Sequence, residues 1–314
     1  MPRLIFIFLD GVGIGTATDG NPFFLARASR LPFYVDGGAW PDGTPIRAID
    51  PLMGVSGLPQ SASGQTSLFT GINVPRLVGG HLGSYPNQKM RELILRHNLL
   101  KTLQSRQRRI AFLNAYPVFS RFFQPPHLRI GTDGRFDFSG EFPETFKKRI
   151  SVTTCMMLSC RFKPFDEHHL AHREAVYQDY SNLSLREHGL NIPEFRPEEA
   201  ADIIGRRSRE FDLTLYEFFQ TDLYGHRRTV DESVNLIRNL DLLLNRLLSR
   251  LHPERDTLLV TSDHGNLEEG ASRTHTRNPV PLIVWGSGAD TLRNRIRRLD
   301  QVTPAILEWM GSGE

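Results

Sequence analysis

Cysteine and lysine are scarce in this 314-residue chain. The only two cysteines, Cys155 and Cys160, exclude a disulfide framework and indicate reduced thiols that pack inside the protein. The basic side chains comprise 33 arginines against 5 lysines. Guanidinium groups hold phosphates in a bidentate fork, but a genomic codon bias gives the same skew, so the excess of arginine by itself indicates no ligand.

Long apolar runs are also missing. No window reaches the roughly 18 uninterrupted apolar residues that a membrane-spanning helix needs, so no membrane partner is expected. The apolar run 4–9 ends at Asp10 without a small-residue cleavage site, and we expect a first buried strand there rather than a signal peptide. These features predict a cytoplasmic protein. The length suits one large domain, or a core with an insertion.

Strands and helices alternate at both ends of the chain. The run 4–10 is apolar up to Asp10, as is typical of a strand that is buried on both faces of a parallel sheet. Further strands are expected over 109–116, 212–219, 256–263 and 280–286. Helical spacing of apolar residues predicts helices over 88–104, 231–251 and about 300–310, and Pro197 followed by two glutamates marks the start of another.

The middle of the chain has a different character. From about 117 to 204 it contains several prolines, clustered aromatic residues and the stretch "HHLAH", without regular alternation of strands and helices. We therefore predict an α/β protein with a mostly parallel central sheet flanked by helices, which carries a small inserted α+β cap. Residues 1–116 and 205–314 would form the core, and residues 117–204 the cap.

Carboxylates and imidazoles collect where the predicted strands end. Ligands of open α/β sheets bind beyond the carboxyl ends of the strands, and the side chains delivered there are Asp10, Asp222, His226, Asp263, His264 and, just before the last strand, His275. Any one of these histidines alone is more often a core or surface residue than a ligand. Together, the oxygen and nitrogen donors suit Zn²⁺ or Mn²⁺, and six of them suggest a pair of ions.

A loop rich in small polar residues, "GLPQSASGQTSLFTGIN" at 57–73, leads into an apolar stretch. We expect it to feed a helix N-terminus, where backbone N–H groups and the helix dipole favour an anion. A hydroxyl beside a divalent cation can ionise and act as a nucleophile, and the chemistry admits Ser61, Ser63, Thr66 and Ser67. Helix capping alone would also explain serine and threonine at this place.

With these residues, the sequence resembles the metal-dependent alkaline phosphatase superfamily, and within it the branch of cofactor-independent phosphoglycerate mutase and phosphopentomutase. The motifs that carry the likeness are "IFLDGVG", "GLPQSASGQT", "DLYGHRRTVDESV", "TSDHGNLEE" and "HTRNPVPLIVWG", in the right order, and they span about 1–75 and 205–314. The resemblance implies one metal on Asp222, His226 and His275. It implies a second metal on Asp10, Asp263 and His264, with the nucleophile oxygen as a further ligand.

The same resemblance implies two-step phosphoryl transfer. Aligning "GQT" with the nucleophile turn of the family points to Thr66, and moving the gap selects Ser61 or Ser63 instead. A phospho-Thr66 intermediate would pass its phosphoryl group to water, as in a phosphatase, or back to the same small phosphorylated metabolite, as in a mutase. In this branch the cap supplies basic residues that hold the substrate, and the candidates here are Arg121, Arg129, Arg149, Arg161 and Lys163.

Two other classes of function fit the same core. A phosphodiesterase or nuclease-like hydrolase would use the arginine-rich surface to hold a polyanion, but no basic stripe interleaved with aromatic residues is present, so nucleic acid is not an expected partner. A non-catalytic metal-binding module would be marked by a missing ligand, and none is missing. The sequence leaves open the substrate, mutase against phosphatase, Mn²⁺ against Zn²⁺, and the oligomeric state.

Overall fold

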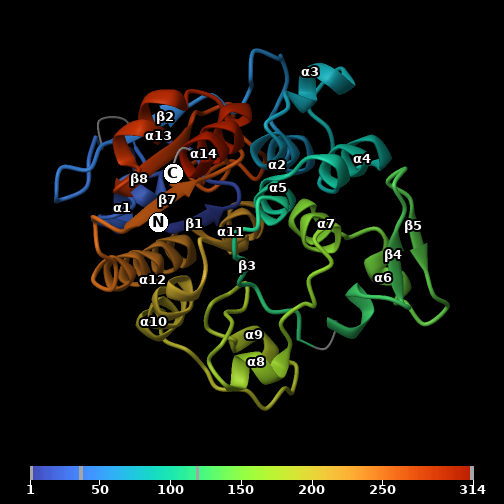
Figure 1. The fold of residues 1–314 in the computed structure, drawn as a ribbon. Helices are drawn as coiled ribbons and strands as arrows, with labels where there is room; N and C mark the ends of the chain where they lie inside the picture. The colour runs from blue at the N-terminus through green and yellow to red at the C-terminus, as the bar shows by residue number, and fades with distance from the viewer. Residues whose placement is uncertain (1–2, 35–37, 118–119, 312–314) are drawn as a thin grey trace.

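The computed structural model describes residues 3–34, 38–117 and 120–311 and has a six-stranded central sheet (Figure 1). Its strands, in spatial order, are β2 (Ile46–Ile49), β8 (Val280–Gly286), β7 (Asp256–Thr261), β1 (Arg3–Leu9), β6 (Leu213–Phe218) and β3 (Ile110–Phe112). The β7, β1, β6 and β3 strands are parallel, while β8 and β2 extend the sheet by antiparallel pairing. The predicted mostly parallel α/β sheet is thereby confirmed.

The helices vary widely in length. They are α1 (Pro22–Ala26), α2 (Ser61–Thr70), α3 (Val74–Val78), α4 (Gln88–Arg96), α5 (Leu99–Ser105), α6 (Glu144–Lys147), α7 (Val152–Ser159), α8 (Glu167–Ala171), α9 (Leu183–Glu187), α10 (Pro197–Arg207), α11 (Gln220–Arg227), α12 (Val230–Leu248), α13 (Ala289–Arg295) and α14 (Val302–Gly311). Short 3₁₀ turns lie at Ser120–Phe123, Ser208–Glu210 and Leu299–Gln301. No helix of the described residues combines the length and hydropathy that crossing a bilayer requires.

Both faces of the sheet are covered, as Figure 1 shows for α10 and α12 on one side and α2, α5 and α14 on the other. Side chains of β1 alternate between two hydrophobic clusters, because successive residues of a strand point to opposite faces. Phe6 and Phe8 pack in the cluster that contains Phe69 of α2, whereas Ile5 and Ile7 pack in the cluster of α10 and α12. This burial on both faces explains why the strand is a continuous apolar run.

Three local expectations differ from the structure. The helix expected over 88–104 is divided into α4 and α5, because the side chain of Asn98 caps a new helix by accepting a hydrogen bond of 2.9 Å from the backbone N–H of Lys101. The strand expected over 109–116 is shorter, at Ile110–Phe112. The β2 strand was not expected, because its four residues pair only at the edge of the sheet and show little apolar pattern.

The segment 117–204 contains the antiparallel hairpin of β4 (Leu128–Ile130) and β5 (Phe136–Phe138) together with α6 to α9. The hairpin and the α8–α9 region lie away from the central sheet (Figure 1). In contrast, α7 packs into the hydrophobic cluster that contains Phe6 and Phe8 of β1 and Phe69 of α2. The α10 helix runs across the expected boundary at residue 204. The division into core and cap stays a prediction.

The two cysteines lie on and just after α7 as buried free thiols. Burial raises the pKa of Cys155 to about 12 and that of Cys160 to about 11, so both stay protonated and pack as apolar side chains.

Candidate functional site

The segments that follow three adjacent strands, β7, β1 and β6, bring all six candidate metal ligands to one edge of the sheet. Asp10 directly follows β1, and α11 begins two residues after β6, so that Asp222 and His226 lie one turn apart on it. Asp263 and His264 follow β7, and the loop before β8 returns His275 to the same place. Parallel strands end on the same side, and the local sequence therefore brings these groups together.

One set of ligand atoms belongs to Asp10, Asp263 and His264, which lie within 4.8 Å of one another. The Nε2 atom of His264 is 3.4 Å from Oδ1 of Asp10 and 3.5 Å from Oδ2 of Asp263. Both of these carboxylate oxygens are buried and accept no hydrogen bond from the described residues. Buried carboxylates without donors are costly, and a cation is the partner that would satisfy them.

The second set comprises Asp222, His226 and His275. Oδ1 of Asp222 lies 3.4 Å from Nε2 of His226 and 3.6 Å from Nε2 of His275, and the two Nε2 atoms are 3.2 Å apart. His264 lies beside this set, since its ring stacks on that of His275 with the ring centroids 3.8 Å apart. The ligand atoms of Asp222, His264 and His275 lie within 4.8 Å of one another. The two sets are therefore direct neighbours.

Backbone carbonyl groups orient all three imidazoles. The Nδ1 atoms lie 2.7 Å from the oxygen of Arg273 for His226, 2.8 Å from that of Pro59 for His275, and 3.3 Å from that of Gly265 for His264. A carbonyl oxygen only accepts hydrogen bonds, so Nδ1 carries a proton in each ring and Nε2 is the nitrogen left to bind a metal. This is the arrangement by which metal-ligating histidines are held.

These contacts fit a divalent transition metal. Nitrogen ligands at about 2.0–2.1 Å from a tetrahedral ion lie roughly 3.3 Å from each other, close to the 3.2 Å between Nε2 of His226 and Nε2 of His275. Two lone pairs that face each other at this distance repel unless a cation or a proton lies between them. The donor set of three carboxylates and three imidazoles suits Mn²⁺ or Zn²⁺.

The ionisation of the cluster also favours added positive charge. Burial raises the pKa of Asp10 well above its usual range, and the charge of Asp263 raises it further. Burial acts to lower the pKa of His264, but the charge of Asp263 and the contact with Asp10 outweigh it and raise this pKa to about 10. Burial acts to raise the pKa of Asp222, yet the hydrogen bond with His226 and the charge of His264 bring it to about 2. Each shift reflects carboxylates that need a positive partner.

Of the four candidate hydroxyls, the structure brings only Ser61 to the ligands. Its Oγ lies 3.0 Å from Nε2 of His264, at the first residue of α2, where backbone N–H groups and the helix dipole favour negative charge. Thr66, the nucleophile expected from the alignment, lies inside α2, fully buried, and its hydroxyl donates to the carbonyl of Ala62 at 2.6 Å. The structure therefore does not place Thr66 at the cluster, because the helix begins five residues earlier than that alignment implies.

The two remaining hydroxyls are engaged within the helix and its neighbours. Ser63 donates to the carbonyl of Gln60 and accepts from the backbone N–H of Leu82. Ser67 donates to the carbonyl of Ser63 and accepts from Val74. Both side chains thus stabilise the start of the helix and the chain around it, which leaves Ser61 as the candidate nucleophile.

Several supporting residues were not identified from the sequence. Glu268 is buried and clamps the loop that carries His275, because its carboxylate accepts hydrogen bonds from the backbone N–H of Gly13 and from Thr276 and Asn278. Glu268 lies in the motif "TSDHGNLEE", so its place beside the ligands Asp263 and His264 could have pointed to it in the sequence. The other supporting contacts are those of Asn266 with Asp222 at 2.8 Å and of Gln65 with Asp10 at 3.2 Å.

Gly11 shows how closely the elements approach each other. Its φ is +69°, and a Cβ atom there would lie 2.6 Å from Oδ1 of Asp222. Any other residue would be strained and would displace a ligand, which explains the glycine directly after Asp10.

The cluster opens into a cavity of about 640 Å³. Its lining includes Ser61 and four of the expected ligands, and continues over Asn114, Tyr116, Arg149, Ser151, Thr154, Tyr177, Glu217 and Arg227. Of the five cap residues expected to hold substrate, only Arg149 lines this cavity. The other four are exposed elsewhere, as Arg121 illustrates by stacking 4.6 Å over the ring of Phe122. Arg227, which directly follows the ligand His226, was missed.

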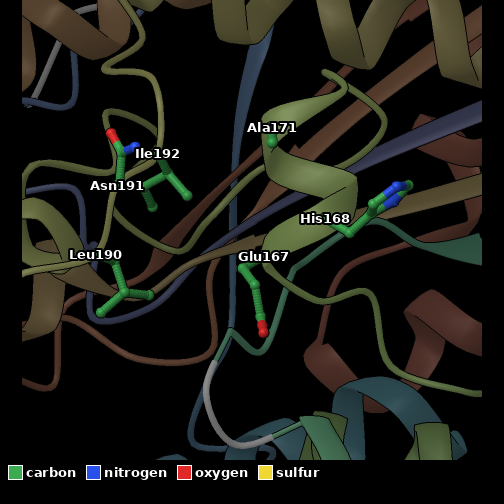
Figure 2. Close-up of a pocket in the computed structure, with 6 residues that line it drawn as sticks. All are labelled: Glu167, His168, Ala171, Leu190, Asn191 and Ile192. Carbon is green, nitrogen blue, oxygen red and sulfur yellow. The ribbon is translucent and has the colours of Figure 1, made fainter.

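A second cavity of about 330 Å³ lies beside α8, lined by Glu167, Leu190 and Ile192 among others (Figure 2). Asp166, His168 and His169 also gather here within ligand distance of one another. However, Asp166 and His169 form the capping box of α8, with 2.6 Å between Oδ1 and Nδ1, and His168 extends away from Leu190 and Ile192 in Figure 2. Helix capping accounts for this group.

Comparisons with known proteins agree with the site. Residues 193–312 match the family model of the Metalloenzyme superfamily. The 2,3-bisphosphoglycerate-independent phosphoglycerate mutase of Acetivibrio thermocellus is 27% identical over 44% of the chain and 29% of its own length, and mutase 2 of Methanosarcina barkeri is 34% identical over 38% of the chain and 24% of its own length. The matched region thus spans less than a third of these relatives.

Solved structures share the fold over the whole chain. The alkaline phosphatase of the Antarctic bacterium TAB5 aligns with a TM-score of 0.55 and 11% identity, covering all of both chains. A protein of Pyrococcus horikoshii aligns with a TM-score of 0.54 and 13% identity, covering all of this chain and 98% of the other. At such low identity these likenesses establish the fold alone. Residues 193–312 are thus similar to the Metalloenzyme superfamily and to part of the phosphoglycerate mutases, and the chain as a whole has an alkaline phosphatase-like fold.

Proposed function

We propose that the protein is a two-metal phosphoryl-transfer enzyme, either a phosphomutase or a phosphomonoesterase, which acts on a small phosphorylated metabolite through a phosphoserine at Ser61. One observation carries the proposal. The Ser61 hydroxyl lies at the start of α2, 3.0 Å from Nε2 of His264, in the wall of the cavity onto which the ligand residues open. This replaces Thr66 with an alternative that the sequence had left open.

Divalent ions, Mn²⁺ or Zn²⁺, would be held by Asp10, Asp263 and His264 with Ser61 in one set, and by Asp222, His226 and His275 in the other. When bound, such ions supply positive charge that stabilises the phosphoryl oxygens and favours ionisation of the serine hydroxyl. The protein's own part is to fix the ligand atoms, and the backbone carbonyls behind the three imidazoles perform this.

In the first step the Ser61 oxygen forms a bond to phosphorus while the ester P–O bond breaks. The serine proton leaves to solvent, and the departing ester oxygen takes up a proton from solvent. The N-terminus of α2 stabilises negative charge on both the serine oxygen and the phosphoryl group. In the second step the oxygen of water, or of another hydroxyl of the same molecule, bonds to phosphorus and loses its proton, while the serine P–O bond breaks and the serine oxygen is protonated again. Water as acceptor makes a phosphatase, and the retained metabolite makes a mutase.

The test combines turnover with location of the phosphoryl group. Protein loaded with Mn²⁺ or Zn²⁺ is incubated with sugar phosphates and glycerate phosphates, and ³¹P NMR follows free phosphate and positional isomers. We expect Ser61→Ala to abolish both products and Thr66→Ala to retain them, with a phosphoryl group on Ser61 in mass spectra of the trapped wild-type protein. No turnover of any ester, or a phosphoryl group on Thr66, would refute the proposal.

A further inference from the structure

Glu217 is a charged residue at a position where the strand pattern calls for an apolar one. On β6 the side chains of Leu213 and Leu215 face the hydrophobic cluster of α2 and α7, and Glu217 follows on the same face because side chains alternate along a strand. Its partner in register on β1 is Phe8, which belongs to that cluster. Glu217 is only 8% exposed, so the carboxyl group is largely removed from water at a cost in stability.

Few groups compensate this carboxyl group. Thr153 of α7 donates a hydrogen bond of 2.7 Å to Oε2 of Glu217, and no arginine or lysine of the described chain forms an ion pair with it. The side chain of Asn114 bonds only to the backbone of residue 217, which holds the strand in place. Burial raises the pKa of Glu217 to about 7, mainly because the charged form is poorly solvated. Nothing in the fold itself requires a carboxyl group here.

The carboxyl group instead faces the cavity that contains Ser61. Around it the wall is built from neutral hydroxyl groups: Tyr116 and Thr154 lie 3.0 Å apart through their oxygens, and Ser151 lies 3.0 Å from the hydroxyl of Thr153. The cationic side chains of the lining, apart from histidines, are Arg149 and Arg227, and both are mainly exposed to solvent. This wall therefore offers hydrogen-bond acceptors and donors, and little positive charge to bind a second anionic group.

We propose that Glu217 determines specificity by accepting a hydrogen bond from a neutral hydroxyl or amino group of the phosphate ester and by repelling a substrate that carries a carboxylate. This rests on the proposed function, and it narrows the substrate to hydroxylated phosphate esters of the sugar phosphate type. Binding of acids such as phosphoglycerate, after which the relatives are named, is disfavoured. A substrate without a donor group leaves the buried Glu217 carboxylate unpaired, and a substrate with a carboxylate brings two negative charges together. Both effects weaken the binding of acids relative to neutral esters.

Binding to Mn²⁺-loaded Ser61→Ala protein tests this without turnover. Calorimetry at about pH 8, above the pKa of about 7 for Glu217, compares two matched pairs: glycerol 3-phosphate with 3-phosphoglycerate, and glucitol 6-phosphate with 6-phosphogluconate. In each pair one neutral group is replaced by a carboxylate. We expect the neutral ester of at least one pair to bind about tenfold more tightly. Adding Glu217→Gln should reduce that ratio to within about threefold, mainly through tighter binding of the acid.

Glu141→Gln is the matched control, since it removes one carboxylate from an exposed position outside the cavity and should leave both ratios unchanged. A merely structural role of Glu217 would lower stability and weaken all four ligands equally. Equal or tighter binding of both acids in the Ser61→Ala protein, or ratios that Glu217→Gln does not move, would overturn the inference. If no ester bound and wild-type protein turned none over, the proposed function would fail and this inference with it, whereas turnover without the predicted ratio would refute the inference alone.

Discussion

The cavity has two ends that are built in different ways. At one end, the candidate metal ligands extend from β7, β1 and β6, which are neighbours in one sheet and end at the same edge. At the other end, the wall of hydroxyl groups around Glu217 combines β6 with Tyr116 and with Ser151 and Thr154 of the α7 region. The first end is built at the ends of neighbouring parallel strands. The second end depends on how the irregular segment between β3 and β6 packs against the sheet.

This difference separates chemistry from selectivity. Ligands fixed to a rigid sheet hold the short distances that a metal needs, which suits the reaction common to a superfamily. Residues brought in by the segment between β3 and β6 can change without disturbing those ligands, which suits the choice of substrate. Four experiments test this difference between the two ends of the cavity, and the one with the largest expected effect comes first.

The largest effect is expected from Asp263→Asn, at the end that carries the candidate metal ligands. Oδ2 of Asp263 is buried without a donor, so an amide in its place offers a weaker ligand and no compensating charge. We expect phosphoryl transfer to fall by about a thousandfold or more, with loss of at least one bound ion. Metal analysis of the purified variant beside turnover measurements checks both parts. Full metal content with normal turnover would remove Asp263 from the ligand set.

Removing metal from the wild-type protein should lower the stability of the folded state. Ions that bind only the folded state stabilise it by about 4.1 kcal/mol when free ion is 1,000 times Kd. Scanning calorimetry of chelated protein, with Mn²⁺ or Zn²⁺ restored stepwise, should show a rise in Tm that depends on ion concentration. The same titration on Asp263→Asn should show a smaller rise. Identical Tm values with and without ion would argue against a site in the folded protein.

The carboxyl group of Glu217 should make stability depend on pH. Its pKa of about 7 in the folded protein exceeds the ordinary value of 4.5, so the folded state holds the proton more tightly than the unfolded state. Proton binding by Glu217 therefore stabilises the folded state. This stabilisation is fully present below pH 4.5 and is lost as the pH rises through about 7, with an upper bound of roughly 3 kcal/mol. The groups that face this carboxyl group are Thr153, the charge of Asp263 and the uncharged hydroxyl of Tyr116, and they are the same in both proteins compared.

Urea unfolding of metal-free wild-type protein and of Glu217→Gln, at several pH values between these limits, isolates the effect. The difference in free energy of unfolding between the two proteins should drift with pH in the direction stated, because glutamine does not titrate. A constant difference would mean that Glu217 keeps an ordinary pKa.

The smallest effect is expected from Thr66→Val. The substitution keeps the buried shape and removes the hydrogen bond to the carbonyl of Ala62, at a cost of about 1 kcal/mol. Turnover should stay within about threefold of wild type, since Thr66 does not line the cavity. Parallel kinetics and urea unfolding of Thr66→Val and Ser61→Ala measure both quantities. Loss of turnover in Thr66→Val at unchanged stability would restore Thr66 as the nucleophile.

Much of the fold could be predicted because burial leaves a strong pattern in sequence. The β1, β6, β7 and β8 strands lie within or close to the expected segments, although β6 and β7 are shorter than expected, and α10 begins at the expected Pro197. The β2 strand could not be predicted, because its residues are only partly buried and pair at one edge. The break between α4 and α5 depends on a single side-chain cap at Asn98, which a periodic apolar pattern does not reveal.

The nucleophile could not be chosen from sequence because α2 begins within a stretch that has weak helix propensity. Serine and glycine favour loops, so "QSASGQT" reads as a loop that ends after Thr66. Packing of Phe69 against Phe6 and Phe8 stabilises the helix from Ser61 onward. A helix that begins there directs Ser61 to the strand ends and turns Thr66 toward its own backbone.

The order of strands and helices along the chain, and the six candidate ligands near the strand ends, can be identified from the sequence because periodicity and strand ends are local properties. The fold in three dimensions is needed to show which hydroxyl meets His264, that Arg149 lines the cavity while Arg121 does not, and that Glu217 faces the same space. These outcomes depend on contacts between residues far apart in the chain, such as Thr153 with Glu217, and such contacts follow from packing rather than from any local pattern.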